Sequence, residues 1–308
     1  MRAANLRLSA APAAARRRGL RLAMQQSQAA YVLMLPFLAH FMVVVAYPFF
    51  YSLYLSFFDA GLNRAPVFVG LDNFARLFAD GQFWRALRNT SYFTVFAVVG
   101  ETVLSLLVAL VMNEKLRWRL AFRTAFFLPV VTSWVVVSIM WSMLFARQGL
   151  ANSVLQWAGL PPQPFLAEGT QAMWIIIALS VWKNLGYYMV IFLAGLQGVP
   201  NELYEAAAID GAMKWRQVWH VALPALRPVI YFVVSISTIN SMQLFTQPFI
   251  MTDGGPLDST LSVVQFLYRR AFVDLEFGYG SAIGTVLLVL LAALSYGNHK
   301  ISDRIAGR

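Results

Sequence analysis

The residues that could do chemistry in this chain are polar side chains set inside long apolar stretches. Four of them recur at spacings of three and four residues, close to one face of a helix: Ser237, Asn240, Gln243 and Gln247. Amides and hydroxyls in an apolar environment must find hydrogen-bonding partners. This face predicts either the lining of a path for a hydroxyl-rich substrate or hydrogen bonding between neighbouring helices, and both interpretations stay open.

A second group of polar residues lies in another apolar stretch, where Asn184 and Tyr188 are one helical turn apart and Tyr187 is adjacent. A tyrosine ring can stack on a sugar face while its hydroxyl makes a hydrogen bond. Packing between helices is the favoured interpretation here, and a contribution to a substrate path is the alternative.

Two charged residues, Glu101 and Lys183, also fall within apolar stretches. Ionisable groups in a membrane are costly, and they are usually paired or face a cavity. We therefore expect Glu101 and Lys183 to pair with each other or to line the cavity. A proton relay is the functional alternative, which a single acid in such a stretch supports only weakly.

The chain lacks the motifs of an enzyme. A phosphate-binding loop needs Gly-Lys-Ser/Thr, and none of the four lysines follows a Gly or precedes Ser or Thr. The histidines, His40, His220 and His299, are too far apart for a zinc site. There is no cysteine, so thiolate chemistry and disulfides are excluded. We expect no catalytic residues, no metal site and no cofactor in this chain.

Composition sets the class of protein. Of the 308 residues 59% are hydrophobic and only 12% are charged, whereas soluble domains carry about a quarter charged residues. A polytopic membrane protein is the expected class, with the lipid bilayer as its main solvent. The net charge of +10 comes largely from arginines beside apolar stretches, so a nucleic-acid partner is not expected.

The elements that must position these residues are six membrane-spanning helices in an all-α bundle. We expect spans near residues 30–55, 90–112, 122–145, 173–196, 224–250 and 279–296. The corresponding organisation is a basic tail over 1–28, a first span with an external amphipathic segment over 29–85, a five-helix core over 86–297 and a short tail over 298–308.

The distribution of lysine and arginine sets the orientation. One side of the expected bundle carries 16 of them, in the N-terminal tail, the 115–119 loop with the neighbouring Arg123, the 200–224 loop with the neighbouring Arg227, and the C-terminus, whereas the other side carries 7. Cytoplasmic loops carry the excess of basic residues. Both termini and the 200–224 loop are therefore predicted to lie in the cytoplasm.

The 200–224 loop is the most polar stretch between the expected spans. Pro200, Asn201 and Glu202 read as a helix start, with Asn at the cap and an acid in the first turn. Gly211 is the natural turning point, because glycine tolerates positive φ. The sequence predicts a helix, a glycine turn and a second short helix here.

This loop resembles the cytoplasmic coupling loop of ABC importer permeases. The residues that carry the resemblance span about twenty positions: Glu205, Ala206, Ala207, Asp210, Gly211, Leu223 and Pro224. The Asp-Gly-Ala form, together with Thr252-Asp253-Gly254-Gly255-Pro256 further on, is most similar to the carbohydrate-uptake, maltose-type branch of that family.

The resemblance implies the type I ABC importer permease fold and a role in importing a carbohydrate across a bacterial inner membrane. It implies that ATP and Mg²⁺ bind a separate ATPase, into which the loop docks. Glu205 would pair with a basic group there, and apolar side chains including Met213 would fill its cleft. The implied partners are a second homologous permease, two ATPase copies and an extracytoplasmic sugar-binding protein.

Two other functions remain as alternatives. A secondary transporter driven by an ion gradient would usually show internal repeats and paired intramembrane charges, neither of which is clear here. A membrane scaffold without transport would not require the polar face at 237–247.

Overall fold

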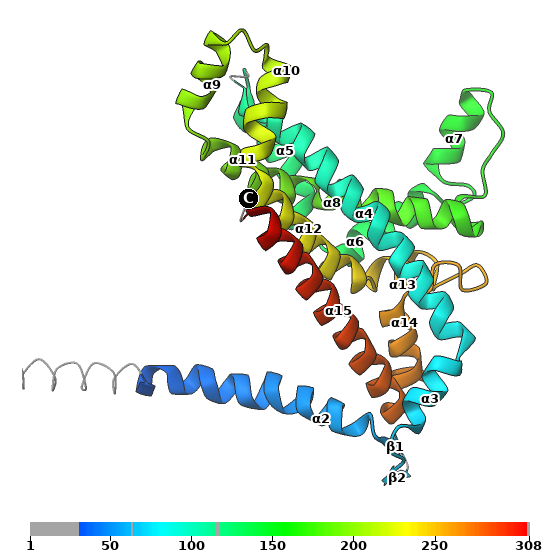
Figure 1. The fold of residues 1–308 in the computed structure, drawn as a ribbon. Helices are drawn as coiled ribbons and strands as arrows, with labels where there is room; N and C mark the ends of the chain where they lie inside the picture. Colours follow the sequence, from blue (N-terminus) through cyan, green and yellow to red (C-terminus); the bar gives the residue numbers. More distant parts are fainter. Residues whose placement is uncertain (1–30, 63, 115–116, 307–308) are drawn as a thin grey trace, which may run out of the picture. The chain divides into compact units, whose positions relative to one another are not determined.

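The computed structural model describes residues 31–62, 64–114 and 117–306, and it divides into two units, Met1–Tyr54 and Leu55–Arg308 (Figure 1). The basic tail expected over 1–28 lies outside the described residues. All but the last residue of the apolar helix Tyr31–Leu55 belongs to the first unit, and this helix contains a π-helical turn, η1 (Phe41–Ala46), followed by α2 (Tyr47–Leu55).

Membrane-length helices dominate the described chain. Four are long and apolar enough to cross a bilayer: Tyr31–Leu55, Gly81–Asn113, Gly169–Gln197 and Phe277–Lys300. Two bent pairs of shorter helices raise the number to six if each pair forms one span. A membrane protein of several apolar helices is thus confirmed, whereas the number of six spans stays a prediction.

The second unit is built around α4 (Gly81–Asn113) and α8 (Gly169–Gln197), which pack extensively against each other. The next helix, α5 (Arg119–Val131), also packs on α8, and α12 (Arg227–Met242) packs on α4 and on α15 (Phe277–Ala306). Gly186 allows the close approach of α5, because a Cβ there would meet the backbone carbonyl of Phe126.

The expected span over 122–145 is not one continuous helix. It consists of α5 and α6 (Trp134–Leu144), which are bent by 97° at residues 132 and 133. Pro129 lies in the last turn of α5, and the Thr132 hydroxyl donates to the Pro129 carbonyl at 2.6 Å. The backbone amide of Thr132 also donates to this carbonyl, at 3.3 Å, so Thr132 closes the end of α5 with both its amide and its hydroxyl.

The expected span over 224–250 is also interrupted. A bend of 67° separates α10 (Lys214–Gln217), η3 (Val218–Ala222) and α11 (Leu223–Ala225) from α12. α12 ends at Met242, and α13 (Thr246–Met251) follows as a separate helix. Gln243 and Gln247 therefore do not share one continuous helix face with Ser237 and Asn240, as the spacing predicted.

Smaller elements complete the second unit. An antiparallel hairpin of β1 (Phe58–Gly61) and β2 (Arg64–Phe68), a departure from the expected all-α fold, pairs Phe58 with Phe68 and precedes α3 (Asp72–Ala79). The segment 146–171 contains α7 (Leu150–Trp157) and η2 (Phe165–Ala167). The segment 251–277 contains α14 (Val263–Tyr268) and η4 (Arg269–Val273).

The apolar core lies where these helices meet. Phe93, Ile176 and Leu179 form one buried cluster between α4 and α8. A second cluster joins Met189 and Phe192 of α8 to the region around Leu226. Asn184 lies on α8 between these two clusters, so apolar side chains are packed on both sides of it along the helix.

Candidate functional site

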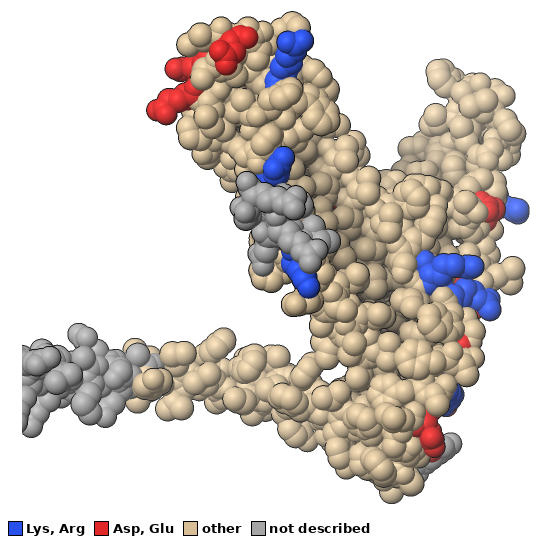
Figure 2. All heavy atoms as spheres, viewed as in Figure 1, with Lys and Arg blue, Asp and Glu red and all other residues tan. Residues whose placement is uncertain are grey.

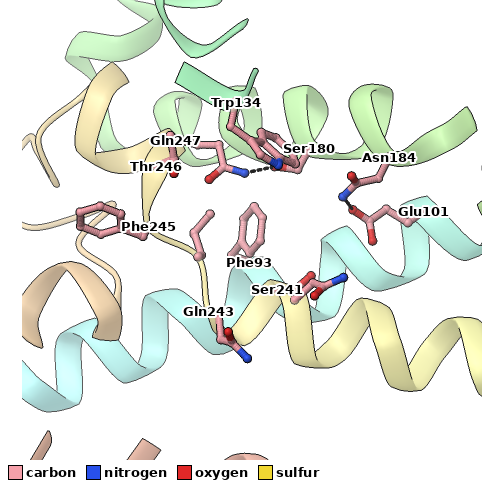
Figure 3. Close-up of a pocket in the computed structure, with 12 residues that line it drawn as sticks. Phe93, Glu101, Trp134, Ser180, Asn184, Ser241, Gln243, Phe245, Thr246 and Gln247 are labelled. Carbon is pink, nitrogen blue, oxygen red and sulfur yellow. Dashed lines mark hydrogen bonds between the residues drawn. The ribbon is translucent and has the colours of Figure 1, made fainter. Parts of the chain in front are cut away.

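A pocket of about 350 Å³ lies among α4, α6, α8, α12 and α13 (Figure 3). Sites for small molecules usually have volumes of about 300–1,000 Å³ and a few placed polar groups. The twelve lining residues are Phe93, Glu101, Trp134, Ser180, Asn184, Asn240, Ser241, Gln243, Leu244, Phe245, Thr246 and Gln247. Amides, hydroxyls and aromatic rings dominate this set.

Breaks in the helices bring several of these residues to the pocket. Trp134 is the first residue of α6, immediately after the sharp bend from α5. Gln243 and Phe245 lie in the interruption between α12 and α13, and Gln247 lies on α13. Irregular backbone at membrane depth is tolerated where it is buried or lines a cavity. The two interruptions are therefore consistent with a polar path.

Glu101 anchors one side of the pocket. Its side chain is almost fully buried, at 1% exposure. Asn184 Nδ2 donates to Glu101 Oε1 at 2.7 Å, and Ser237 Oγ donates to Oε2. Three separate helices, α4, α8 and α12, thus converge on one carboxylate, which a single polar stripe on one helix would not reveal.

A weaker polar contact lies on the other side of the pocket. Gln247 Nε2 donates to Ser180 Oγ at 3.4 Å, and the Ser180 hydroxyl itself donates to the Ile176 carbonyl at 2.9 Å (Figure 3). Asn240 is within side-chain hydrogen-bonding reach of Tyr188, whereas the Gln243 side chain has no hydrogen-bond partner among the described residues. The Gln243 amide, which lines the pocket, is therefore the group best placed to meet a ligand.

Lys183 does not pair with Glu101, so that prediction is wrong. Its ammonium donates to the backbone carbonyls of Pro129 at 3.0 Å and Val130 at 3.2 Å. It also lies 4.6 Å from the centroid of the Trp134 ring, within the range of a cation–π contact. The alternative part of the prediction, a charge that lines the cavity, describes Glu101.

The sequence identified much of the pocket and missed the rest. Asn184, Asn240, Gln243 and Gln247 line it, and Ser237 touches it through Glu101, whereas Tyr188 is buried in the neighbouring core. The lining residues that were missed are Phe93, Trp134, Ser180, Ser241, Leu244, Phe245 and Thr246. Ser180 lies one helical turn before Asn184, so the helical spacing could have identified it.

The 200–224 loop forms the expected helix, glycine turn and helix. α9 (Asn201–Ile209) begins at Asn201 with Pro200 in the capping position, so Asn201 is not the cap that was expected. Gly211 has φ of +77°, and the Ala212 amide donates to the Ala207 carbonyl at 2.8 Å. These contacts close α9 before α10 begins.

The surface of this loop exposes large apolar side chains. Ile209 is 87% exposed, and Met213 and Trp215 are also exposed. Acidic side chains gather over the same end of the molecule, where α9 carries Glu202 and Glu205 and is followed by Asp210 (Figure 2). Exposed apolar groups rimmed by charge are typical of a surface that binds another protein.

The other residues that carry the resemblance to a coupling loop lie on two helices of this loop. Glu205, Ala206 and Ala207 fall on α9, and Leu223 and Pro224 open α11. Lys214 Nζ is 2.8 Å from Glu114 Oε2, which links the second helix of the loop to the end of α4. No cluster of His, Asp or Glu that could hold a metal occurs in the described part of the chain.

The chain matches a known family over most of its length. Residues 101–305 match the model of the "Binding-protein-dependent transport system inner membrane component". The arabinooligosaccharides transport system permease protein AraP of Bacillus subtilis is 35% identical over 96% of this chain and 96% of its own length. The lactose transport system permease protein LacF of Rhizobium radiobacter is 36% identical over 85% of this chain and 89% of its own length.

Solved structures share the fold. A bacterial ABC transporter involved in the import of the acidic polysaccharide alginate superimposes with a TM-score of 0.83 and 24% identity, covering 93% of this chain and 99% of that chain. A second alginate transporter structure, in complex with a pentasaccharide-bound periplasmic protein, gives a TM-score of 0.82 at 23% identity, covering 92% of this chain and 96% of that chain. By family match, identity to relatives and fold, the chain belongs to the binding-protein-dependent transport system inner membrane components: it is a permease subunit of an ABC importer.

Proposed function

We propose that this permease subunit translocates a carbohydrate, either a sugar, an oligosaccharide or a polyol, into the cytoplasm. The pocket among α4, α8 and α12 supports the class of substrate, because amides and hydroxyls can replace the water around sugar hydroxyls. Trp134 and Phe245 add rings on which a sugar face can stack. Relatives named for arabinooligosaccharides and lactose support the same class.

Six spans with both termini in the cytoplasm are the topology that we propose. Counting each bent pair as one span gives six in the described chain. The excess of lysine and arginine on the side of the 200–224 loop supports its cytoplasmic location.

The single observation that supports the proposed coupling to an ATPase is the exposed helix–turn–helix over 200–224. Ile209, Met213 and Trp215 present apolar surface that a partner's cleft would cover. Glu205 would pair with a basic group of that cleft, and Gly211 sets the bend between the helices. Residues Ala206, Ala207, Asp210, Leu223 and Pro224 complete the docking element.

The assembly that we propose contains a second homologous permease, two ATPase copies and an extracytoplasmic sugar-binding protein. ATP and Mg²⁺ would bind the ATPase subunits. Closure of the ATPase dimer would move the docked loops as rigid bodies, and the pocket would switch its access from the cytoplasm to the outside.

Two measurements test the proposal. The tagged chain is purified from its native membrane in mild detergent, and an ATPase with a phosphate-binding loop is expected to co-purify. Saccharide uptake by the same cells is then measured with a protonophore while cellular ATP is maintained. Uptake should persist, and its loss under these conditions, without a co-purifying ATPase, would favour the gradient-driven alternative.

A further inference from the structure

The pocket contains one ionisable side chain among its described lining residues, and it is acidic. Glu101 lines the wall together with the uncharged amides and hydroxyls around it. Lys183 lies nearby on α8, but its ammonium is directed to the carbonyls of Pro129 and Val130. No cation therefore balances the Glu101 carboxylate among the described residues that line the pocket.

The hydrogen bonds at Glu101 match those of a carboxylate that accepts at both oxygens. Asn184 Nδ2 donates to one oxygen and Ser237 Oγ donates to the other. An ionised carboxylate offers about four lone-pair sites, so each oxygen keeps the capacity to accept a further donor. A sugar hydroxyl or an ammonium group can supply that donor, whereas a second carboxylate cannot.

Acidic saccharides need a different kind of site. Carboxylate ligands are recognised by arginine forks, by lysine or by helix N-termini. Like charges that share a site of low dielectric constant disfavour each other strongly. A uronate in this pocket would meet a negative charge and no described cation.

We propose that Glu101 is a specificity-determining residue, which makes the pocket accept neutral and basic saccharides and reject acidic ones. This inference rests on the proposed function, since it assumes that the pocket is the saccharide path. By this inference the chain differs from the alginate transporters in the substrate that it accepts, although it shares their fold. A shared fold does not determine which substrate is bound.

Direct binding to the permease tests this inference without the selection made by the binding protein. The assembled permease–ATPase complex in detergent is titrated with methyl glucoside, glucosamine and glucuronate, and binding is followed by saturation-transfer NMR. The wild type should bind methyl glucoside and glucosamine about tenfold or more tightly than glucuronate. The Glu101→Gln variant should lose most of this difference.

Two further variants make the test specific. Glu101→Asp keeps the charge and should keep the discrimination against glucuronate even if affinity falls. Glu114→Gln makes the same chemical change outside the pocket, where the Glu114 carboxylate pairs with Lys214, and it should behave as the wild type does.

The outcomes separate the inference from the proposed function. If the wild type binds the neutral probe and Glu101→Gln leaves the ratio between neutral and acidic probes unchanged, the inference is overturned while the saccharide path stands. If the wild type binds none of the three probes, the saccharide path and the inference fall together.

Discussion

The ammonium of Lys183 on α8 donates to the carbonyl oxygen of Pro129 in the last turn of α5, at 3.0 Å. It also donates to the next carbonyl, that of Val130. The C-terminal end of a helix carries partial negative charge and unpaired carbonyls, so a cation there is favourable. The same ammonium lies over the ring of Trp134. Trp134 is the first residue of α6, immediately after the break, and its side chain lines the pocket.

Replacing Lys183 should therefore destabilise the broken span. Lys183→Met leaves two carbonyls without their charged donor in an apolar setting, which costs about 1–3 kcal/mol. Thermal unfolding of the purified protein in detergent measures the effect, and Lys183→Arg should restore part of the loss. Lys214→Met is the control, because Lys214 belongs to an exposed pair with Glu114 that contributes about 0–1 kcal/mol. Equal unfolding temperatures for Lys183→Met and Lys214→Met would contradict the assigned role.

The coupling loop was predictable from the sequence because its structure is local. Alanine-rich α9, the positive φ of Gly211 and the short second helix depend on residues within about twenty positions of each other. The amide residues of the pocket were also identifiable, since amides such as Asn184 and Asn240 stand out in apolar segments.

The long-range part of the site was not predictable in the same way. Pro129 is a local signal of a break within 122–145, but the contact of Lys183 with this break comes from more than fifty residues away and has no local signal. Trp134 reaches the pocket through that break. The pairing of Glu101 with Lys183 was a reasonable expectation from charge, but nearer hydrogen-bond partners satisfy both groups.

The second prediction concerns the turn at Gly211. Its φ of +77° disfavours any other residue, although a Cβ would meet no atom within 4 Å, so Gly211→Ala should cost about 1 kcal/mol through backbone strain alone. The strain should change the angle between α9 and α10, and the amount of co-purifying ATPase should fall.

Gly159 is the matched control for this prediction. It has φ of +73°, again with no atom within 4 Å of a Cβ, and it lies after α7, outside the coupling loop. Gly159→Ala should carry a similar strain and leave the ATPase yield unchanged. Equal losses of ATPase from both variants would show that strain in general, rather than the docking turn, causes the effect.

The third prediction concerns Asp258, which holds the segment 252–262 to the start of α4. Gln82 Nε2 donates to its carboxylate at 2.9 Å, and Arg269 Nη1 lies 3.5 Å from it. Asp258→Ala removes both contacts, so amide hydrogen exchange over 252–262 should become faster. Asp274→Ala is the control, because Asp274 pairs with Arg270 four residues earlier in the chain. Unchanged exchange over 252–262 in Asp258→Ala would mean that the backbone of this segment is held by its own hydrogen bonds.

The fourth prediction is a dependence on pH at the start of α8. Glu168 caps this helix by accepting from the amides of Gln171 at 2.9 Å and Thr170 at 3.1 Å. These backbone hydrogen bonds, that of Gln171 first, hold the pKa of the Glu168 carboxyl below its ordinary value of 4.5. Because the folded state binds the proton less readily than the unfolded state, the ionised cap stabilises the protein above the ordinary pKa.

This stabilisation is lost as the pH falls through the lowered pKa of the folded state. Glu168→Ala removes the cap at every pH. The wild type should therefore unfold at a higher temperature than Glu168→Ala at neutral pH, and the difference should shrink once the pH falls below 4.5. Thermal unfolding of both proteins in the same detergent across that range measures it. A difference that stays constant as the carboxyl titrates would show that Glu168 acts through packing, since only the charged cap is sensitive to pH.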